Sequence, residues 1–229
     1  MATLDTFVAD LRAIFALRLS SVVLYGRHAV SPAGPGTSAH TLVVVTTLGF
    51  GDLEACARRS AAWRKDGLAV PLLMDAGELG RSLDAFPAEF SAMQSAYRVV
   101  FGPDPFEGLS VDPKDLRRAC EVEARGHLLH LREGFVEGGG TPDAIASLVA
   151  ASAPALRALL VNLARLDGTV EAAPSAYATA RLGPVHGRTL ATVLTFLENP
   201  IVAADAARGF PAYVEAAEAL VAYVDRWRS

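Results

Sequence analysis

Apolar residues recur at helical spacing near the start of the chain, where they predict an amphipathic helix from Thr3 to Leu17. A continuous, mostly β-branched run follows at Leu42 to Val45, bounded by turn residues. Such a run favours a central strand that is covered on both faces. Strands separated by helices are typical of an α/β layer structure, so the N-terminal half is expected to contain a sheet with helices packed on it.

The segments after this strand continue the alternation of helix and strand. Gly49 to Asp52 turns the chain into a helix, with Asp52 as the expected N-cap. The stretch Phe86 to Ala96 is ambiguous between strand and helix. The other expected elements are a helix from Leu53 to Asp66, a short strand from Pro71 to Met74 and a short helix from Glu78 to Leu83.

The C-terminal half is predicted to be helical throughout. Asp112-Pro113 begins a helix that runs to Glu137, and Gly138 to Gly140 end it. Thr141-Pro142 begins a second long helix that ends at Asp167-Gly168, with Pro154 expected to kink it. The short connection predicts that these two helices are antiparallel. Further helices are expected over Ala176 to Leu182, Arg188 to Glu198 and Ala212 to Arg228, which together make a bundle of four or five helices.

Composition limits the classes of function. The chain has 229 residues, is 52% hydrophobic and carries a formal net charge of −4, which favours a folded protein and makes nucleic acid an unlikely partner. No uninterrupted apolar run reaches the eighteen or so residues of a membrane helix, and the first ten residues carry acids rather than Lys or Arg. The simplest expectation is a cytoplasmic protein without membrane contact. Cys56 and Cys120 lack paired spacing, so both are expected to be buried as small hydrophobes.

Two segments of the N-terminal half form a motif, Ser21-Val-Val-Leu-Tyr-Gly26 and Thr37-Ser-Ala-His-Thr-Leu-Val-Val-Val45. They resemble the first two strands of a nucleotidyltransferase of the DNA polymerase beta-like fold. The likeness extends from about Leu19 to about Leu166. Over this range the chain is similar to a group of bacterial proteins that fuse a nucleotidyltransferase-like domain to a helical one. The resemblance implies an α/β (α+β) N-terminal domain with a small mixed sheet, residues 1–108, followed by an all-α helical bundle, residues 109–229.

The metal-binding acids of that superfamily are missing from this motif. In the family the first strand ends in Gly-Ser, and the second begins with two carboxylates one residue apart. Here Arg27 follows Gly26, and Ser38 and His40 stand at the positions matched to the two acids. Residues i and i+2 of a strand point to one face, so this pair keeps the geometry of the acids. A hydroxyl and an imidazole are poor ligands for Mg²⁺, which selects carboxylate oxygens.

The leading hypothesis is a catalytically degenerate nucleotidyltransferase-like protein that senses a nucleotide or contacts a protein partner. No catalytic residue and no metal ligand is assigned. The candidate nucleotide-binding cleft comprises Gly26, Arg27, His28, Ser38 and His40. Within it, Arg27 and His28 offer anion binding through the guanidinium group and backbone N-H groups.

Two alternatives stay open. In the first, the protein is an active transferase on a nucleotide or small-molecule acceptor, and Asp52, Asp75 or Glu89 supplies displaced carboxylates for Mg²⁺. In the second, the bundle is structural and mediates self-association, as in a homodimer. Dependence on Mg²⁺ separates the first alternative from the leading hypothesis.

Three polar residues of the first long bundle helix form another candidate site. Glu123, His127 and His130 are spaced i, i+4 and i+7, so they face one side of the helix. Two imidazoles one turn apart can share a metal ion, but no third strong ligand is identifiable, so a partly exposed polar face is the favoured interpretation.

Two weaker patterns lie in the same half of the chain. Arg125 and His130 resemble the Arg and His pair of helical ribonucleases that accompany small nucleotidyltransferases, although this spacing is common. His186 and Arg188 are expected in a glycine-containing turn between helices, where an anion can bind.

Overall fold

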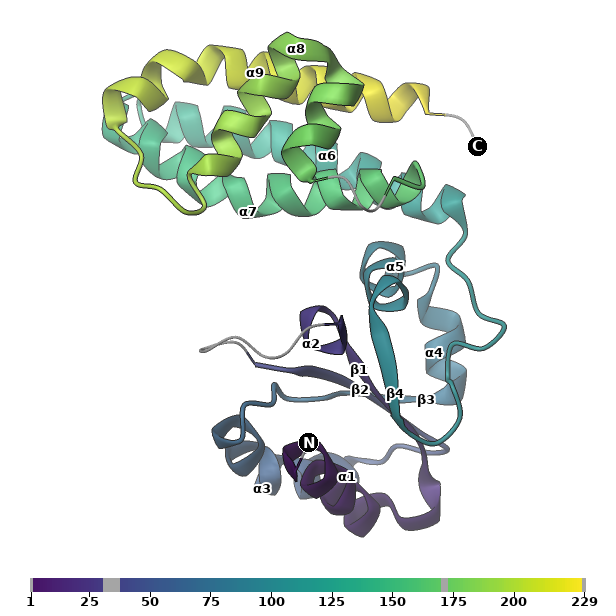
Figure 1. Cartoon of the computed structure of the whole chain (residues 1–229). Helices are drawn as coiled ribbons and strands as arrows, with labels where there is room; N and C mark the ends of the chain where they lie inside the picture. The colour runs from purple at the N-terminus through teal and green to yellow at the C-terminus, as the bar shows by residue number, and fades with distance from the viewer. Residues whose placement is uncertain (1, 31–37, 170–172, 228–229) are drawn as a thin grey trace. The chain divides into compact units, whose positions relative to one another are not determined.

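A computed structural model of the chain describes residues 2–30, 38–169 and 173–227 (Figure 1). Contacts divide the chain into two compact units, Met1–Val111 and Asp112–Ser229. The first unit contains a sheet with helices on both faces, and the second is entirely helical in its described part. The predicted fold class, a small mixed sheet followed by a helical bundle, is therefore confirmed.

The sheet has four strands in the order β3-β2-β1-β4. β1 is antiparallel to both of its neighbours, and β3 is parallel to β2. The parallel step from β2 to β3 needs a crossover, which the helix α3 between them provides. The strands are β1 (Leu19–Tyr25), β2 (His40–Val45), β3 (Leu72–Asp75) and β4 (Tyr97–Phe101).

Helices cover both faces of the sheet. Val22 and Val43 pack with α1 and α3 on one face, whereas Val23 and Leu42 pack with α4 and α5 on the other. Successive strand residues alternate between the two faces, so a strand covered on both sides needs apolar residues at every position. This arrangement explains the unbroken apolar run in β2. The helices of this unit are α1 (Ala2–Phe15) with a 3-10 turn over Ala16–Arg18, α2 (Arg27–Val30), α3 (Phe50–Lys65), α4 (Ala76–Ser82) and α5 (Pro87–Ser95).

Two local expectations are resolved or corrected in this unit. The ambiguous stretch forms helix α5, which begins with Pro87 and buries Phe90 and Met93 against the sheet. The N-cap of α3 is Gly49 rather than Asp52. Asp52 instead occupies the third helical position, where its carboxylate accepts a hydrogen bond from the Gly49 N-H at 3.0 Å. This is the bond that the third helical residue of a capping box makes back to the N-cap N-H. The other bond of the box is missing, because glycine has no side chain.

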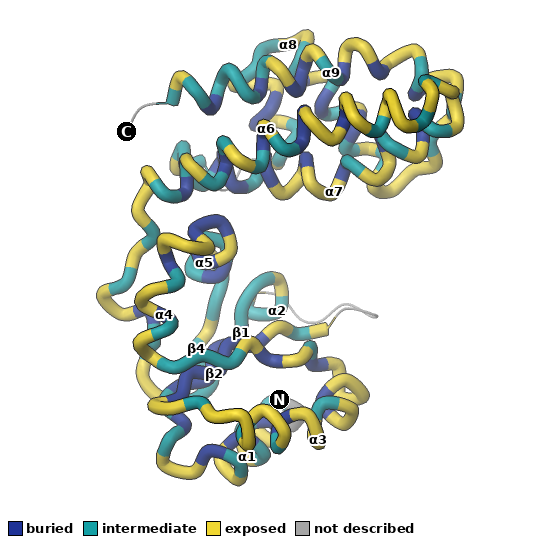
Figure 2. The backbone as a smooth tube through the Cα atoms, turned by 180° about the vertical axis from the view of Figure 1, so that it is seen from behind, coloured by how far each residue is buried: buried dark blue, intermediate teal, exposed yellow. Residues whose placement is uncertain are grey.

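The second unit is a bundle of four helices that each bury one stripe toward the others (Figure 2). α6 and α7 begin and end at the residues that the proline and glycine signals predicted. Asp112 caps α6 by accepting a hydrogen bond from the Lys114 N-H at 2.8 Å. The four helices are α6 (Pro113–Glu137), α7 (Pro142–Leu166), α8 (Pro174–Thr195) and α9 (Ala203–Arg226).

The later helices differ from the sequence prediction. α8 changes direction at Gly183, whose backbone is left-handed (φ 77°), and helical structure resumes at once. His186 and Arg188 therefore lie within a helix and not in a turn, because Pro184 is accepted in the first turn of the resumed segment. α9 begins nine residues earlier than predicted and continues through Pro211.

α7 is the core helix of the bundle. By length and composition it is, within the described part of the chain, the one helix that could cross a membrane, although polar residues interrupt its apolar run. It packs against α6, α8 and α9. Leu156, Leu159, Leu160 and Leu163 on its inner face are at most 1% exposed. Burial in the bundle accounts for the leucines of this inner face.

Asp167 ties the end of α7 to the two later helices. Its carboxylate accepts hydrogen bonds from the Tyr177 hydroxyl at 2.8 Å and from the Trp227 indole N-H at 3.0 Å, and also from the Tyr223 hydroxyl. Arg181 Nε lies 3.0 Å from the same carboxylate, whose side chain is only 8% exposed. A buried carboxylate with this many donors is fully satisfied.

We predict that Asp167→Ala lowers the free energy of unfolding by about 3 kcal/mol, because it leaves partly buried donors and a cation without their acceptor. Glu218→Ala is the control, since its ion pair with Arg132 joins two side chains that are about half exposed. That change should cost less than about 1 kcal/mol. Urea unfolding measures the loss of stability in both variants. Equal losses would contradict the conclusion that the hydrogen bonds of Asp167 stabilise the bundle.

Candidate functional site

Three ring-bearing residues lie side by side at one end of the sheet. The strand register pairs Tyr25 at the end of β1 with His40 at the start of β2, and with Tyr97 at the start of β4. The ring centroids of Tyr25 and His40 are 5.8 Å apart, with 35° between their planes. Directly paired residues point to one face of a sheet, so the three form a row across three strands.

The turn after β1 places the basic residues beside this row. Gly26 adopts a left-handed backbone conformation (φ 75°), and its N-H donates to the Ala96 carbonyl at 2.7 Å. α2 starts at the next residue, so Arg27 is exposed and His28 is half-buried directly beyond the strand. Only glycine takes this conformation without strain, which gives Gly26 a structural role.

Ser38 and His40 are both exposed at the entrance to β2. Between them, the Ala39 backbone donates to the Gly67 carbonyl at 2.8 Å and accepts from the Ala69 N-H at 2.9 Å. The structure therefore joins Gly26, Arg27 and His40 at one sheet end through the pairing of Tyr25. Part of the loop that connects β1 to Ser38 lies outside the described residues.

Carboxylates are absent from both strands of the motif. The sequence contains no Asp or Glu between Asp10 and Asp52, a stretch that includes β1, α2 and β2 entirely. Carboxylate ligands for Mg²⁺ at this sheet end would have to come from elsewhere in the chain.

Asp52 and Asp75 are at the other end of the sheet. Val45, the last residue of β2, pairs with Leu19 and with Asp75. Leu19 and Tyr25 are separated by the length of β1, about 20 Å at the rise of a strand. Asp52 follows β2 and binds Arg18 through two contacts of 2.7 Å, and Asp75 caps α4 by accepting from the Glu78 N-H at 2.8 Å. Neither of these two acids therefore lies at the sheet end that holds Tyr25 and His40.

Glu89 is the third acid that the sequence offers as a displaced carboxylate. It is exposed in the first turn of α5. This helix ends at Ser95, directly before Ala96, whose carbonyl accepts the hydrogen bond from the Gly26 N-H. Glu89 lies six positions before Ser95, which corresponds to about 9 Å along the helix axis. A single carboxylate at that distance does not reproduce two acids on one strand face.

The two tyrosines of the row are neutral hydroxyls at physiological pH. Burial raises the pKa of Tyr25. The hydrogen bond from the Tyr97 hydroxyl to Asp104 Oδ2, at 2.7 Å, raises the pKa of Tyr97. The row thus has the exposed Arg27 beside Tyr25 and the carboxylate of Asp104 beside Tyr97.

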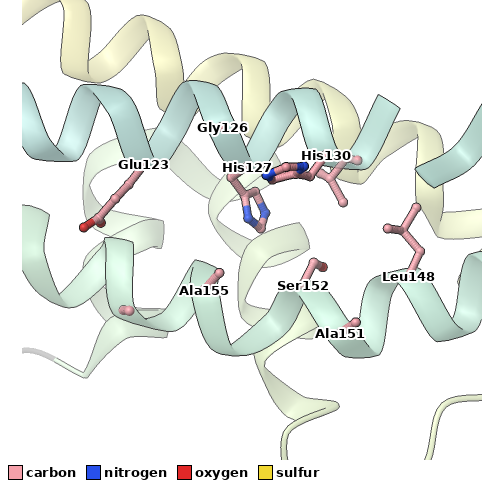
Figure 3. A pocket seen from close by; sticks show the side chains of 10 residues that line it. Glu123, Gly126, His127, His130, Leu148, Ala151, Ser152 and Ala155 are labelled. Atoms are coloured by element: carbon pink, nitrogen blue, oxygen red, sulfur yellow. The ribbon is translucent and has the colours of Figure 1, made fainter. Parts of the chain in front are cut away.

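The α6 candidates line a pocket between α6 and α7 (Figure 3). Glu123, His127 and His130 all line it, so the prediction that they share one face of the helix is confirmed. The two imidazoles differ in environment, because His127 is buried and His130 is exposed. No group of three or more metal-ligating side chains occurs among the residues that the structure describes. Arg125 is engaged by Glu121 and Asp225.

The sequence did not reveal the row at the sheet end. Tyr25 and His40 both stand within the two motif segments, yet their adjacency depends on antiparallel register. Tyr97 belongs to a strand more than seventy residues away from Tyr25, by the numbering. The signal available in the sequence was a tyrosine at the end of one strand, Tyr25, and another at the start of a later strand, Tyr97.

Comparisons with known proteins support the fold and no more. No protein-family model and no curated protein matches the sequence. The structure is similar to a crystal structure of spectinomycin adenyltransferase from Enterococcus faecialis with ATP and spectinomycin, with a TM-score of 0.54 over 98% of this chain and 99% of that one. Only 12% of aligned residues are identical. The chain thus shares the fold of that structure, and the likeness shows nothing of its activity.

We predict that Asp52→Asn changes the pH dependence of stability. The hydrogen bond from Arg18 holds the pKa of Asp52 at about 2, below its ordinary value of 3.8. The ion pair therefore stabilises the folded state fully above about pH 4, and its contribution is lost as the pH falls toward 2. Unfolding should show the variant less stable than the wild type at pH 6, with a difference that shrinks at pH 3.

Glu54→Gln, on an exposed position of α3, is the control and should leave the pH dependence unchanged. A gap between wild type and Asp52→Asn that stayed constant from pH 6 to pH 2 would exclude this ion pair as its source.

Proposed function

We propose that this protein is a catalytically degenerate nucleotidyltransferase-like module that binds a nucleotide without metal-dependent transfer. The observation that carries the proposal is the stretch without Asp or Glu between Asp10 and Asp52. Two-metal transfer needs carboxylates that hold cations against the triphosphate, and both strands that would supply them have none. The cleft residues are Gly26, Arg27, His28, Ser38 and His40.

The chemistry of the sheet end supports an anionic ligand. The Arg27 guanidinium is exposed and offers charge-assisted hydrogen bonds to phosphate oxygens. The adjacent rings of Tyr25 and His40 offer an aromatic surface for a base. The two strands of the motif carry no carboxylate that would repel the phosphates, and Asp104, which accepts from the Tyr97 hydroxyl, is an acid next to the row. ATP is the first nucleotide to test, because the structurally similar adenyltransferase was crystallised with it.

A degenerate module could instead contact a protein partner. The bundle could also have a structural role, in which it joins two copies of the chain as a homodimer. The active-transferase alternative remains open, but it would need carboxylates from outside the motif strands, and Asp52 and Asp75 lie at the opposite end of the sheet from His40. We therefore place metal-independent nucleotide binding first. A cytoplasmic location agrees with this role.

Calorimetric titration with ATP, in Mg²⁺ and again in EDTA, tests the proposal. We expect similar affinities in both buffers. Arg27→Ala should weaken binding about tenfold, the loss of one charge-assisted phosphate contact, whereas Arg58→Ala, on an exposed position of α3, should not. Absence of ATP binding, or transfer of a nucleotidyl group that a chelator abolishes, would refute metal-independent binding as the function.

The double substitution Ser38→Asp with His40→Asp tests whether these residues stand at the acid positions. If they do, ATP binding should become dependent on Mg²⁺, since two carboxylates one residue apart on a strand restore a cation site. The control is Thr46→Asp with Thr47→Asp, which places two carboxylates at exposed positions beyond the other end of β2. Equal metal dependence in both variants would refute the alignment.

A further inference from the structure

The outer side of α6 carries large apolar side chains that the bundle does not cover. Val122, Leu129 and Val136 are 68%, 54% and 78% exposed. They are spaced i, i+7 and i+14, so they form one line along the helix, the α6 stripe. At 3.6 residues per turn the stripe lies opposite Ala124 and Leu131, which are buried in the bundle. A seven-residue apolar repeat on the exposed side of a helix is the pattern against which a second helix packs.

Gly126 makes a notch beside the α6 stripe. It lies four residues after Val122 and three before Leu129, on the same side of the helix. A Cβ added to Gly126 would meet no atom within 4 Å, so packing inside the chain does not require glycine there. Glycine weakens a helix relative to alanine. A large side chain of a second molecule that rests on the bare backbone would account for the glycine.

The exposed charges of this side of α6 change sign along the helix. Near its start, the side chain of Arg118 is 74% exposed, and its ion pair with Asp115 has a distance of 3.6 Å. Near its end, Glu133 and Glu137 are exposed. A parallel pair of α6 helices would bring like charges together. An antiparallel pair places the basic start of each helix against the acidic end of the other, so the charges favour a second copy in that orientation.

The other two arginines of this side are neutralised within the chain. Arg125 lies 2.7 Å from Asp225, and Arg132 lies 2.6 Å from Glu218. Both acids belong to α9. These ion pairs offset the positive charge that two copies would otherwise bring together.

A groove between α6 and α9 widens the apolar surface at the end of the α6 stripe. It has a volume of about 680 Å³, and Phe135, Val136, Pro211 and Val214 are among the residues that line it. From Arg118 to Glu137 the helix extends for about 28 Å. Two helices in contact over this length, with a groove beside them, offer more than the isolated apolar residues that are normal on a monomer.

We propose that two copies of this chain form a dimer through α6, in antiparallel orientation, with Leu129 of each copy resting on Gly126 of the other. A two-fold axis makes both contacts identical, so one surface serves both copies. In this register Arg118 lies one helical turn from the position opposite Glu133 of the other copy, within reach of an arginine side chain. The inference goes beyond the proposed nucleotide site and rests on the bundle alone.

Sedimentation equilibrium of the full chain tests the proposal. We expect a mass about twice the 24.1 kDa of one chain at micromolar concentration. Leu129→Asp should weaken the dimer by about tenfold or more, because it places two carboxylates beside the two-fold axis. Val185→Asp, at a comparably exposed valine of α8, should leave the dimer unchanged. A monomer at every concentration would refute the dimer, and an unaffected dimer in Leu129→Asp would refute this surface.

A charge exchange tests the antiparallel orientation. Arg118→Glu and Glu133→Arg should each weaken the dimer by about tenfold, because each brings like charges together across the two copies. Both substitutions in one chain should restore the affinity of the wild type, since the two charges have then changed places. A double variant no tighter than the single variants would refute antiparallel pairing.

The notch at Gly126 tests the register. Gly126→Leu should weaken the dimer by filling the space that Leu129 of the other copy occupies. Gly80→Leu, at an exposed glycine of α4 with equally open surroundings, is the control and should have no effect. Circular dichroism shows whether each variant keeps its helices. A folded Gly126→Leu variant that dimerises as tightly as the wild type would refute the contact between Leu129 and Gly126.

Discussion

The antiparallel pairing of β1 with β2 determines which polar residues can act together in the N-terminal unit. This register brings the end of β1 against the start of β2, so Tyr25 meets His40. The same register sends the end of β2 to the opposite side, where the chain continues to Asp52. Because a strand holds its residues at a fixed rise, a carboxylate at the wrong end cannot reach the cleft without loss of the pairing.

The helical unit combines a rigid end with an open groove. Around Asp167, donors from α8, α9 and the segment after α9 converge on one buried carboxylate, and these bonds fix the ends of three helices. Further along α7, small residues face α6 and leave space unfilled. His127 links the two features of the bundle, since its hydrogen bond to Tyr213 joins the wall of the pocket to α9.

The likeness to an adenyltransferase at 12% identity illustrates how little of a fold depends on particular side chains. Apolar residues on alternating strand positions and along helix faces are enough to specify the layers. The chemistry belongs to a few positions at the sheet ends, which can change without affecting the core. In this chain Ser38 and His40 are exposed, so their identity is free of packing constraints.

Local signals in the sequence determined the elements, because caps, breakers and periodicity act over a few residues. Asp112-Pro113 and Gly138 set the ends of α6, and the apolar run in β2 predicted a strand covered on both faces. The resemblance of the two motif segments predicted the fold class, and the five cleft residues that it indicates stay a prediction. Where two local signals conflicted, as at Pro211 within α9, burial of Phe210 and Tyr213 in the bundle decided the outcome.

Only the tertiary structure decided the contacts between distant segments. The placement of Asp52 and Asp75 away from Gly26 follows from strand register, and the row of Tyr25, His40 and Tyr97 joins three strands. The hydrogen bond between His127 and Tyr213 joins residues eighty-six positions apart. Such pairings are set by the packing of the whole unit, since a residue's spacing along the chain carries no information about its partner across a sheet or a bundle.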